Sequence, residues 1–111
     1  MAVQVIMNQQ KGPLPVKATF NSPSSAPMYL EVVGSVWTTT ANQMIGIGIL
    51  MDGAGIGNAQ IFSNTASTHR TVVSAYIQVK LGQGQHTVTL GPATATTTAD
   101  LNDFYTVVLH Y

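Results

Sequence analysis

Apolar and polar residues alternate along most of this chain with a period of two. The alternation is clearest in HRTVVSAYIQVKL (69–81), where apolar side chains from Val73 to Leu81 share one face and polar side chains share the other. The same period runs through six other segments: 2–7, 15–20, 27–37, 44–51, 85–90 and 103–111. Period-two patterning with β-branched and aromatic residues predicts β-strands.

The segments between these stretches are rich in Gly, Pro, Ser, Thr and Asn, which are turn residues. No window has a sustained helical period with caps at its ends. About eight strands at this spacing in 111 residues predict one all-β domain over residues 1–111. We expect an antiparallel two-sheet β-sandwich, jelly-roll-like, because that fold protects its sheet edges.

The segment MIGIGILMDGAGIG (44–57) combines large aliphatic residues with closely spaced glycines. It does not contain G-x-G-x-x-G, and no lysine follows its P-loop-like spacing. We interpret it as a strand whose isoleucines face the core, followed by a hairpin turn at Asp52-Gly53. Gly46 and Gly48 would then admit a close neighbour on the opposite face. A loop of the same chain, a flat ligand or a second subunit could fill that space, and we favour the subunit.

Charged residues make up 7% of the chain and the formal net charge is zero, whereas ordinary domains contain about 25% charged residues. Such a surface favours self-association. It argues against nucleic acid and anionic membranes as partners, because both are bound through clustered positive charge. The absence of cysteine excludes disulfides. No signal peptide or membrane-spanning apolar run is visible, so membrane insertion is not expected and localisation is left open.

The closing strand, DFYTVVLHY (103–111), is largely apolar on both faces. A strand at the surface of a monomer would keep one face polar, so one face is expected to meet a second chain. With the glycine face, this gives a predicted oligomer interface of six residues: Gly46, Gly48, Tyr105, Val107, Leu109 and Tyr111.

The last third of the chain resembles a known superfamily. VKLGQGQHTVTL (79–90) resembles the hairpin that precedes the last strand of the tumour-necrosis-factor and complement-type jelly rolls, and DFYTVVLHY resembles their closing strand. Small β-sandwich proteins of bacteria and phages are similar in the same way. The resemblance implies a homotrimer, with a dimer as the second choice, and a binding role rather than catalysis.

Candidate chemistry is sparse. The densest acidic cluster is DLND (100–103), which could coordinate Ca²⁺ or form a turn whose Asx side chains bond their own backbone. We favour the turn and predict neither a metal nor a cofactor. Carboxylates and amides beside aromatic rings can also bind sugars. The candidate ligand-binding residues on this reasoning are Trp37, Tyr29, Asp100, Asn102 and Asp103.

The three histidines, His69, His86 and His110, are interpreted as surface or interface residues rather than metal ligands. Ser35 or Ser74 with His69 and Asp100 has the composition of a hydrolytic triad, but no G-x-S-x-G motif is present. We therefore expect a non-catalytic, lectin-like binding module that recognises carbohydrate or a surface ligand. The alternative is a structural or assembly protein of a phage, a virion or a bacterial surface, and a hydrolase is the least favoured function.

Overall fold

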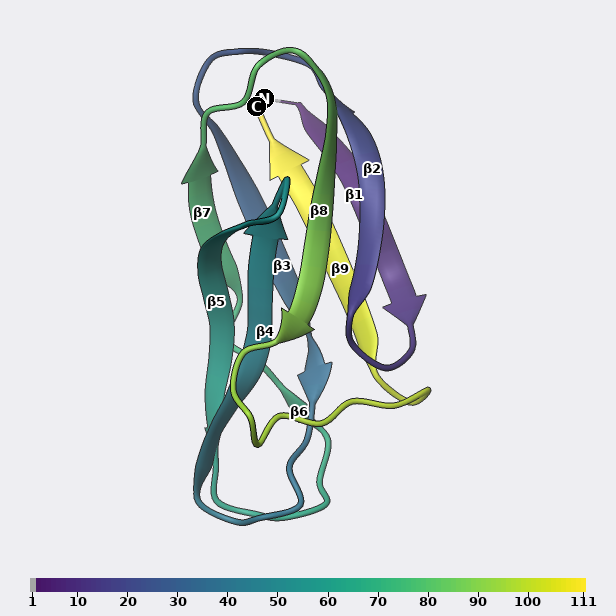
Figure 1. Ribbon diagram of the computed structural model, residues 1–111, viewed down its shortest axis with the longest axis vertical. Coiled ribbons are helices and arrows are strands. Elements are labelled where there is room, and N and C mark those ends of the chain that lie inside the picture. The colour runs from purple at the N-terminus through teal and green to yellow at the C-terminus, as the bar shows by residue number, and fades with distance from the viewer. Residues whose placement is uncertain (1) are drawn as a thin grey trace.

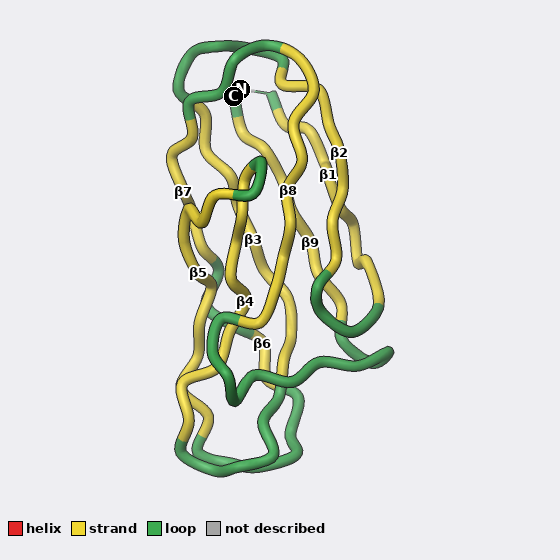
Figure 2. The backbone as a smooth tube through the Cα atoms, in the orientation of Figure 1, coloured by secondary structure: helices red, strands yellow, loops and turns green. Residues whose placement is uncertain are grey.

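A computed structural model describes residues 2–111 of the chain (Figure 1). The described residues form nine strands joined by loops and turns (Figure 2). The strands are β1 (Val3–Lys11), β2 (Val16–Ser22), β3 (Met28–Val36), β4 (Gln43–Met51), β5 (Ala54–Ser63), β6 (Arg70–Thr71), β7 (Ala75–Val79), β8 (Gly84–Pro92) and β9 (Phe104–His110). Over residues 2–111, no helix is long and apolar enough to cross a membrane.

The strands pack as two antiparallel sheets, as the sequence predicted. One sheet has the order β1-β9-β3-β6, with β7 also paired to β3, and the other has the order β2-β8-β4-β5. Sequential strands therefore alternate between the sheets at the start of the chain, and the first strand pairs with the last. This strand order defines a jelly-roll β-sandwich.

The core lies between the sheets and is built by alternate residues of each strand. Met28, Leu30 and Val32 of β3 are buried against Ile45 and Ile47 of β4, as the alternation predicted. The Asp52-Gly53 hairpin is confirmed as well. Both turn residues have positive φ, 52° and 85°, the combination that a two-residue turn of type I′ requires.

The space beside Gly46 is filled by a loop of the same chain. The Gly46 N–H donates to Thr97 Oγ1 at 3.2 Å, and the Ala93 N–H donates to the Gly46 carbonyl at 2.9 Å. A Cβ at this position would also collide with the backbone of Ala59 and Gln60 on β5. The prediction that a second subunit fills this space is therefore wrong at Gly46.

The closing strand β9 also corrects the predicted interface. Tyr105, Val107 and Leu109 are fully buried in the sandwich core of a single chain, so they are not available to a second one. The Tyr105 hydroxyl donates a hydrogen bond to the Gly12 carbonyl at 2.8 Å, which satisfies its polar end. Of this face only Tyr111, 43% exposed, lies at the surface.

The segment 69–81 is two short strands rather than one. The Val72 N–H donates to the Gly34 carbonyl of one sheet, and the Val73 N–H donates to the Gln60 carbonyl of the other, each at 3.0 Å. Because consecutive residues bond to opposite sheets, the strand cannot continue, and Val73 is 66% exposed instead of facing the core. The predicted hairpin at 79–90 is also wrong, since β7 and β8 belong to different sheets.

Candidate functional site

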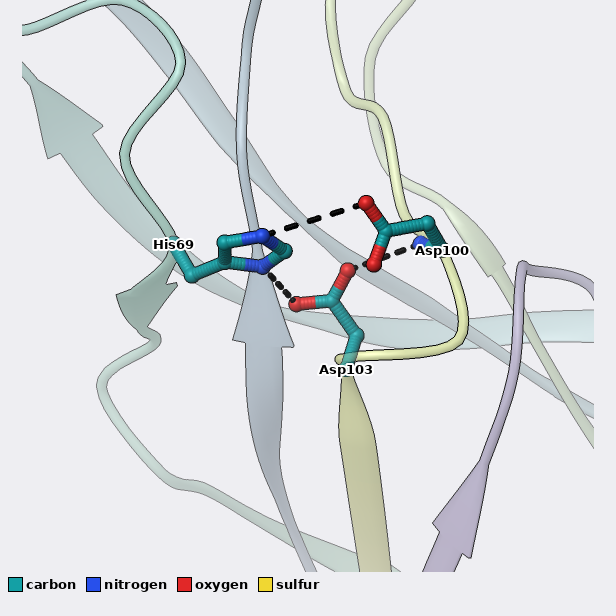
Figure 3. A group of neighbouring side chains, drawn as sticks. All are labelled: His69, Asp100 and Asp103. Atoms are coloured by element: carbon teal, nitrogen blue, oxygen red, sulfur yellow. Dashed lines mark hydrogen bonds and ion pairs between the residues drawn. The ribbon is translucent and has the colours of Figure 1, made fainter.

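Three segments that are distant in sequence meet at one end of the sandwich. They are the end of β3, the loop that precedes β6 and the loop that precedes β9. An isolated bridge between Trp37 and Thr98, with N–H···O distances of 2.9 and 2.8 Å, fixes the last of these loops to the end of β3. Figure 3 shows His69 from the β6 side meeting Asp100 and Asp103 from the β9 side.

The Asp103 carboxylate is the centre of this cluster. It is fully buried and accepts hydrogen bonds from Ser35 Oγ at 2.7 Å, His69 Nδ1 at 2.7 Å and the Asp100 N–H at 2.8 Å. A carboxylate only accepts hydrogen bonds, so His69 Nδ1 carries the proton. Asp103 therefore holds all three segments in register.

Asp100 points toward solvent beside His69. Its Oδ1 accepts the N–H of Asn102 at 2.8 Å, which confirms the Asx turn that the sequence predicted. Its Oδ2 lies 3.8 Å from His69 Nε2, and the two side chains are 41% and 39% exposed. The carboxylate of Asp100, the imidazole of His69 and the exposed Asn102 thus form the polar surface of the cluster.

Trp37 supplies an aromatic wall to the same cluster. Its ring centroid is 5.9 Å from that of His69, with an interplanar angle of 47°. The Trp37 side chain is partly exposed, while its Nε1 is buried and has no acceptor among residues 2–111. Four of the five predicted ligand-binding residues, Trp37, Asp100, Asn102 and Asp103, therefore meet at one place.

Asp103 and Asp100 favour the protonated, charged form of His69. The hydrogen bond to Asp103 raises the pKa of His69 above its ordinary value of 6.5, burial opposes this, and the charges of Asp103 and Asp100 add to it. Because the folded-state pKa is raised, the pair stabilises the fold fully below pH 6.5. That contribution is lost as the pH rises through the folded-state pKa.

Two other chemistries can be tested against this geometry. His69, Asp100 and Asp103 offer metal-ligand atoms that lie within 4.8 Å of one another, but the Asp103 oxygens already accept three hydrogen bonds. A cation would have to displace these donors. Ser35 Oγ bonds to Asp103 rather than to His69, so these residues do not form the serine–histidine–aspartate relay of a hydrolase.

Tyr29, the fifth predicted residue, lies elsewhere. It faces outward near the opposite end of β3, in register with His110. It is eight positions before Trp37, which corresponds to about 26 Å of extended strand. His86 and His110 do not join the cluster either. They pair with Asp52 at 2.6 Å and with Glu31 at 2.8 Å.

Several solved structures are similar to this chain in fold. One is the C-terminal domain of EclA, described as a sugar-binding protein, with 15% identity over 98% of this chain and 79% of that chain and a TM-score of 0.51. Another is CBM35 from Cellvibrio japonicus Abf62, with 12% identity over 99% of this chain and 94% of that chain and a TM-score of 0.53. At these identities the likeness establishes the jelly-roll fold.

A viral protein has the same fold. The VP2 subviral particle of infectious bursal disease virus has 9% identity over 97% of this chain, which corresponds to 32% of the VP2 chain, and a TM-score of 0.53. No known protein family and no curated protein sequence matches the chain.

Proposed function

We propose that this protein is a non-catalytic carbohydrate-binding module whose saccharide binds at the Asp103-centred loop cluster. The observation that carries the proposal is the meeting of an aromatic ring, an exposed carboxylate, an imidazole and an amide on a surface fixed by one buried carboxylate. The Asp100 carboxylate accepts hydrogen bonds from sugar hydroxyls, and Asn102 both accepts and donates. Trp37 and His69 cover the apolar face of the sugar ring.

The similar folds support the same class of function. The C-terminal domain of EclA is described as sugar-binding, and CBM35 is by its name a carbohydrate-binding module. The viral similarity is to a much longer chain, so it favours the structural alternative less. The missing serine–histidine contact is a further reason to prefer binding over hydrolysis.

The first test measures saccharide binding of an Asp100→Asn variant. We expect the wild-type protein to bind members of a glycan array. The variant should bind the best of them about ten- to a hundredfold more weakly in calorimetry, since a hydrogen bond to a charged group contributes about 1.5–3 kcal/mol. Asp52→Asn is the matched control. This variant removes the carboxylate that pairs with His86, which is far from the cluster in sequence. Its saccharide binding should be normal.

Two outcomes would contradict this proposal. One is that no saccharide on the array binds the wild-type protein. The other is that the Asp100 and Asp52 variants bind the same saccharide equally well.

Self-association is the second part of the proposal. Strands β4 and β5 contain no Asp, Glu, Lys, Arg or His, and their outer face exposes Met44, Leu50 and Phe62. Gly48 and Leu50 line an open groove of about 530 Å³ on these strands. Such an apolar face without charge favours contact with a second copy. This face takes the place of the one predicted on β9.

Sedimentation equilibrium tests this part. We expect the wild-type protein at micromolar concentration to have two or three times its chain mass of 11.7 kDa. Phe62→Asp should lower that mass because it places a charge on the apolar face. Val3→Asp, an exposed position on the other sheet, should leave it unchanged. A monomeric wild-type protein would rule out self-association.

A further inference from the structure

The outer face of the β1-β9-β3-β7 sheet carries a second aromatic group. Tyr29 and Glu31 project from β3, Tyr76 and Gln78 from β7, and His110 from β9; we call these five residues the tyrosine face. In the register, Tyr29 lies between His110 and Gln78, and Glu31 lies beside Tyr76. Tyr29 is 51% exposed and Tyr76 is 63% exposed. Two large aromatic rings exposed to water on one sheet surface are typical of a binding site.

The polar groups of this face are organised around Glu31. His110 Nε2 lies 2.8 Å from Glu31 Oε1, and the rings of His110 and Tyr76 have their centroids 6.1 Å apart. Hydrogen bonds from His110 first, and then from Tyr76, lower the pKa of Glu31. Glu31 is therefore a fixed hydrogen-bond acceptor beside the rings of His110 and Tyr76.

Charge limits what this face can bind. Over residues 29–33, 75–79 and 104–110, the only residues of the Asp, Glu, Lys, Arg or His types are Glu31 and His110, and these two pair with each other. Among these residues neither an anionic nor a cationic ligand finds an unpaired countercharge, and the nearest free cation in the sequence is the exposed Lys80, just beyond the end of β7. The chemistry of the face is aromatic surface together with a carboxylate and the exposed amide of Gln78, which suits a neutral molecule with many hydroxyl groups.

We propose that the tyrosine face is a second saccharide-binding surface, for an extended and uncharged polysaccharide. This inference rests on the proposed carbohydrate-binding function. The two tyrosine rings stack against the apolar faces of sugar rings, and Glu31 and Gln78 accept hydrogen bonds from hydroxyls. Tyr29 and Tyr76 are diagonal neighbours on adjacent strands, about 7–8 Å apart at Cα, so they contact a chain of sugars more fully than a single sugar.

The two surfaces are separated along β3. Tyr29 and Trp37 lie about 26 Å apart if the strand is extended, too far for one sugar ring to contact both. A polysaccharide can therefore engage the loop cluster and the tyrosine face as two linked sites. Linked sites bind a polymer more tightly than either site binds a short fragment.

The test combines protein NMR with retention on a solid polysaccharide. Cellohexaose and xylohexaose are titrated into ¹⁵N-labelled protein, and insoluble cellulose and xylan are used for retention. We expect amide shifts near Tyr29, Tyr76 and His110, and about five- to tenfold weaker retention of Tyr29→Ala and Tyr76→Ala. Val73→Ala, which removes an exposed apolar side chain outside the face, should be retained like the wild type.

The outcomes separate the two sites. Shifts confined to the loop cluster, with normal retention of both tyrosine variants, would overturn the second surface and leave the proposed function intact. Shifts confined to the tyrosine face would support the second surface and overturn the loop cluster as the sugar site. A fall in sedimentation mass for Tyr29→Ala or Tyr76→Ala would show that a second copy covers the face, and would also overturn the inference.

Discussion

Replacing Ile47 by alanine is expected to lower the free energy of unfolding by about 2–5 kcal/mol, and replacing it by aspartate is expected to prevent folding. Ile47 is fully buried in the middle of β4. Its Cδ1 lies 3.0 Å from the position that a Cβ on Gly34 would occupy, so it packs directly against the opposite sheet. Truncation leaves a cavity between the two sheets, and a charge there would be buried without a partner.

Urea denaturation of Ile47→Ala measures this effect, with Leu50→Ala on the same strand as the control. Leu50 points away from the core and is partly exposed, so its truncation should cost much less. A larger loss for Leu50→Ala than for Ile47→Ala would mean that the strand presents the other face to the core. A soluble Ile47→Asp protein with a wild-type melting curve would lead to the same conclusion.

Alternation was sufficient to predict the faces of the long strands. In β4 every second residue from Ile45 to Met51 is large and apolar, and in β3 the same holds from Met28 to Val32, so a shift by one residue would expose the whole set. The Asp52-Gly53 turn was predictable because few residue pairs accept two positive φ angles. These features depend on local chemistry, which a sequence displays directly.

Which strands pair with one another depends on contacts between residues that are distant in sequence, and the sequence was insufficient to predict these pairings. The period of two continues through Val72 and Val73, but it does not indicate that these residues bond to different sheets. The same limit produced the incorrect hairpin at 79–90. In β9 both faces are largely apolar, so the pattern does not indicate which face points inward. The structure shows that the inward face is the one with Tyr105, whose hydroxyl donates to the Gly12 carbonyl.

The candidate site was predicted in part for the same reason. The acidic residues of DLND stand out within four positions, and Trp37 was a visible aromatic candidate. His69 was treated as a surface histidine because its partner Asp103 is 34 residues away. The role of Ser35 was missed as well, since serines are common and only the packing of β3 against β9 brings it to Asp103.

Replacing Asp103 by asparagine is expected to disturb the candidate site and the fold together. Hydrogen bonds to a charged group contribute about 1.5–3 kcal/mol each, and Asp103 accepts three of them. An amide keeps one accepting oxygen and turns a donor toward the other partners. We therefore expect a loss of about 2–5 kcal/mol in the free energy of unfolding. The pKa of His69 should also fall, because its hydrogen bond to the carboxylate is the main cause of its elevation.

Chemical denaturation measures the first effect, and an NMR titration of the His69 ring measures the second. Asp52→Asn is the control: it removes the exposed carboxylate that pairs with His86, so it should lower the pKa of His86, leave that of His69 unchanged and cost little stability. An Asp103→Asn protein as stable as the Asp52→Asn protein, with an unchanged His69 pKa, would mean that the buried carboxylate does not hold the three segments together. Saccharide binding should be lost with the cluster, because Asp100 and His69 are positioned through Asp103.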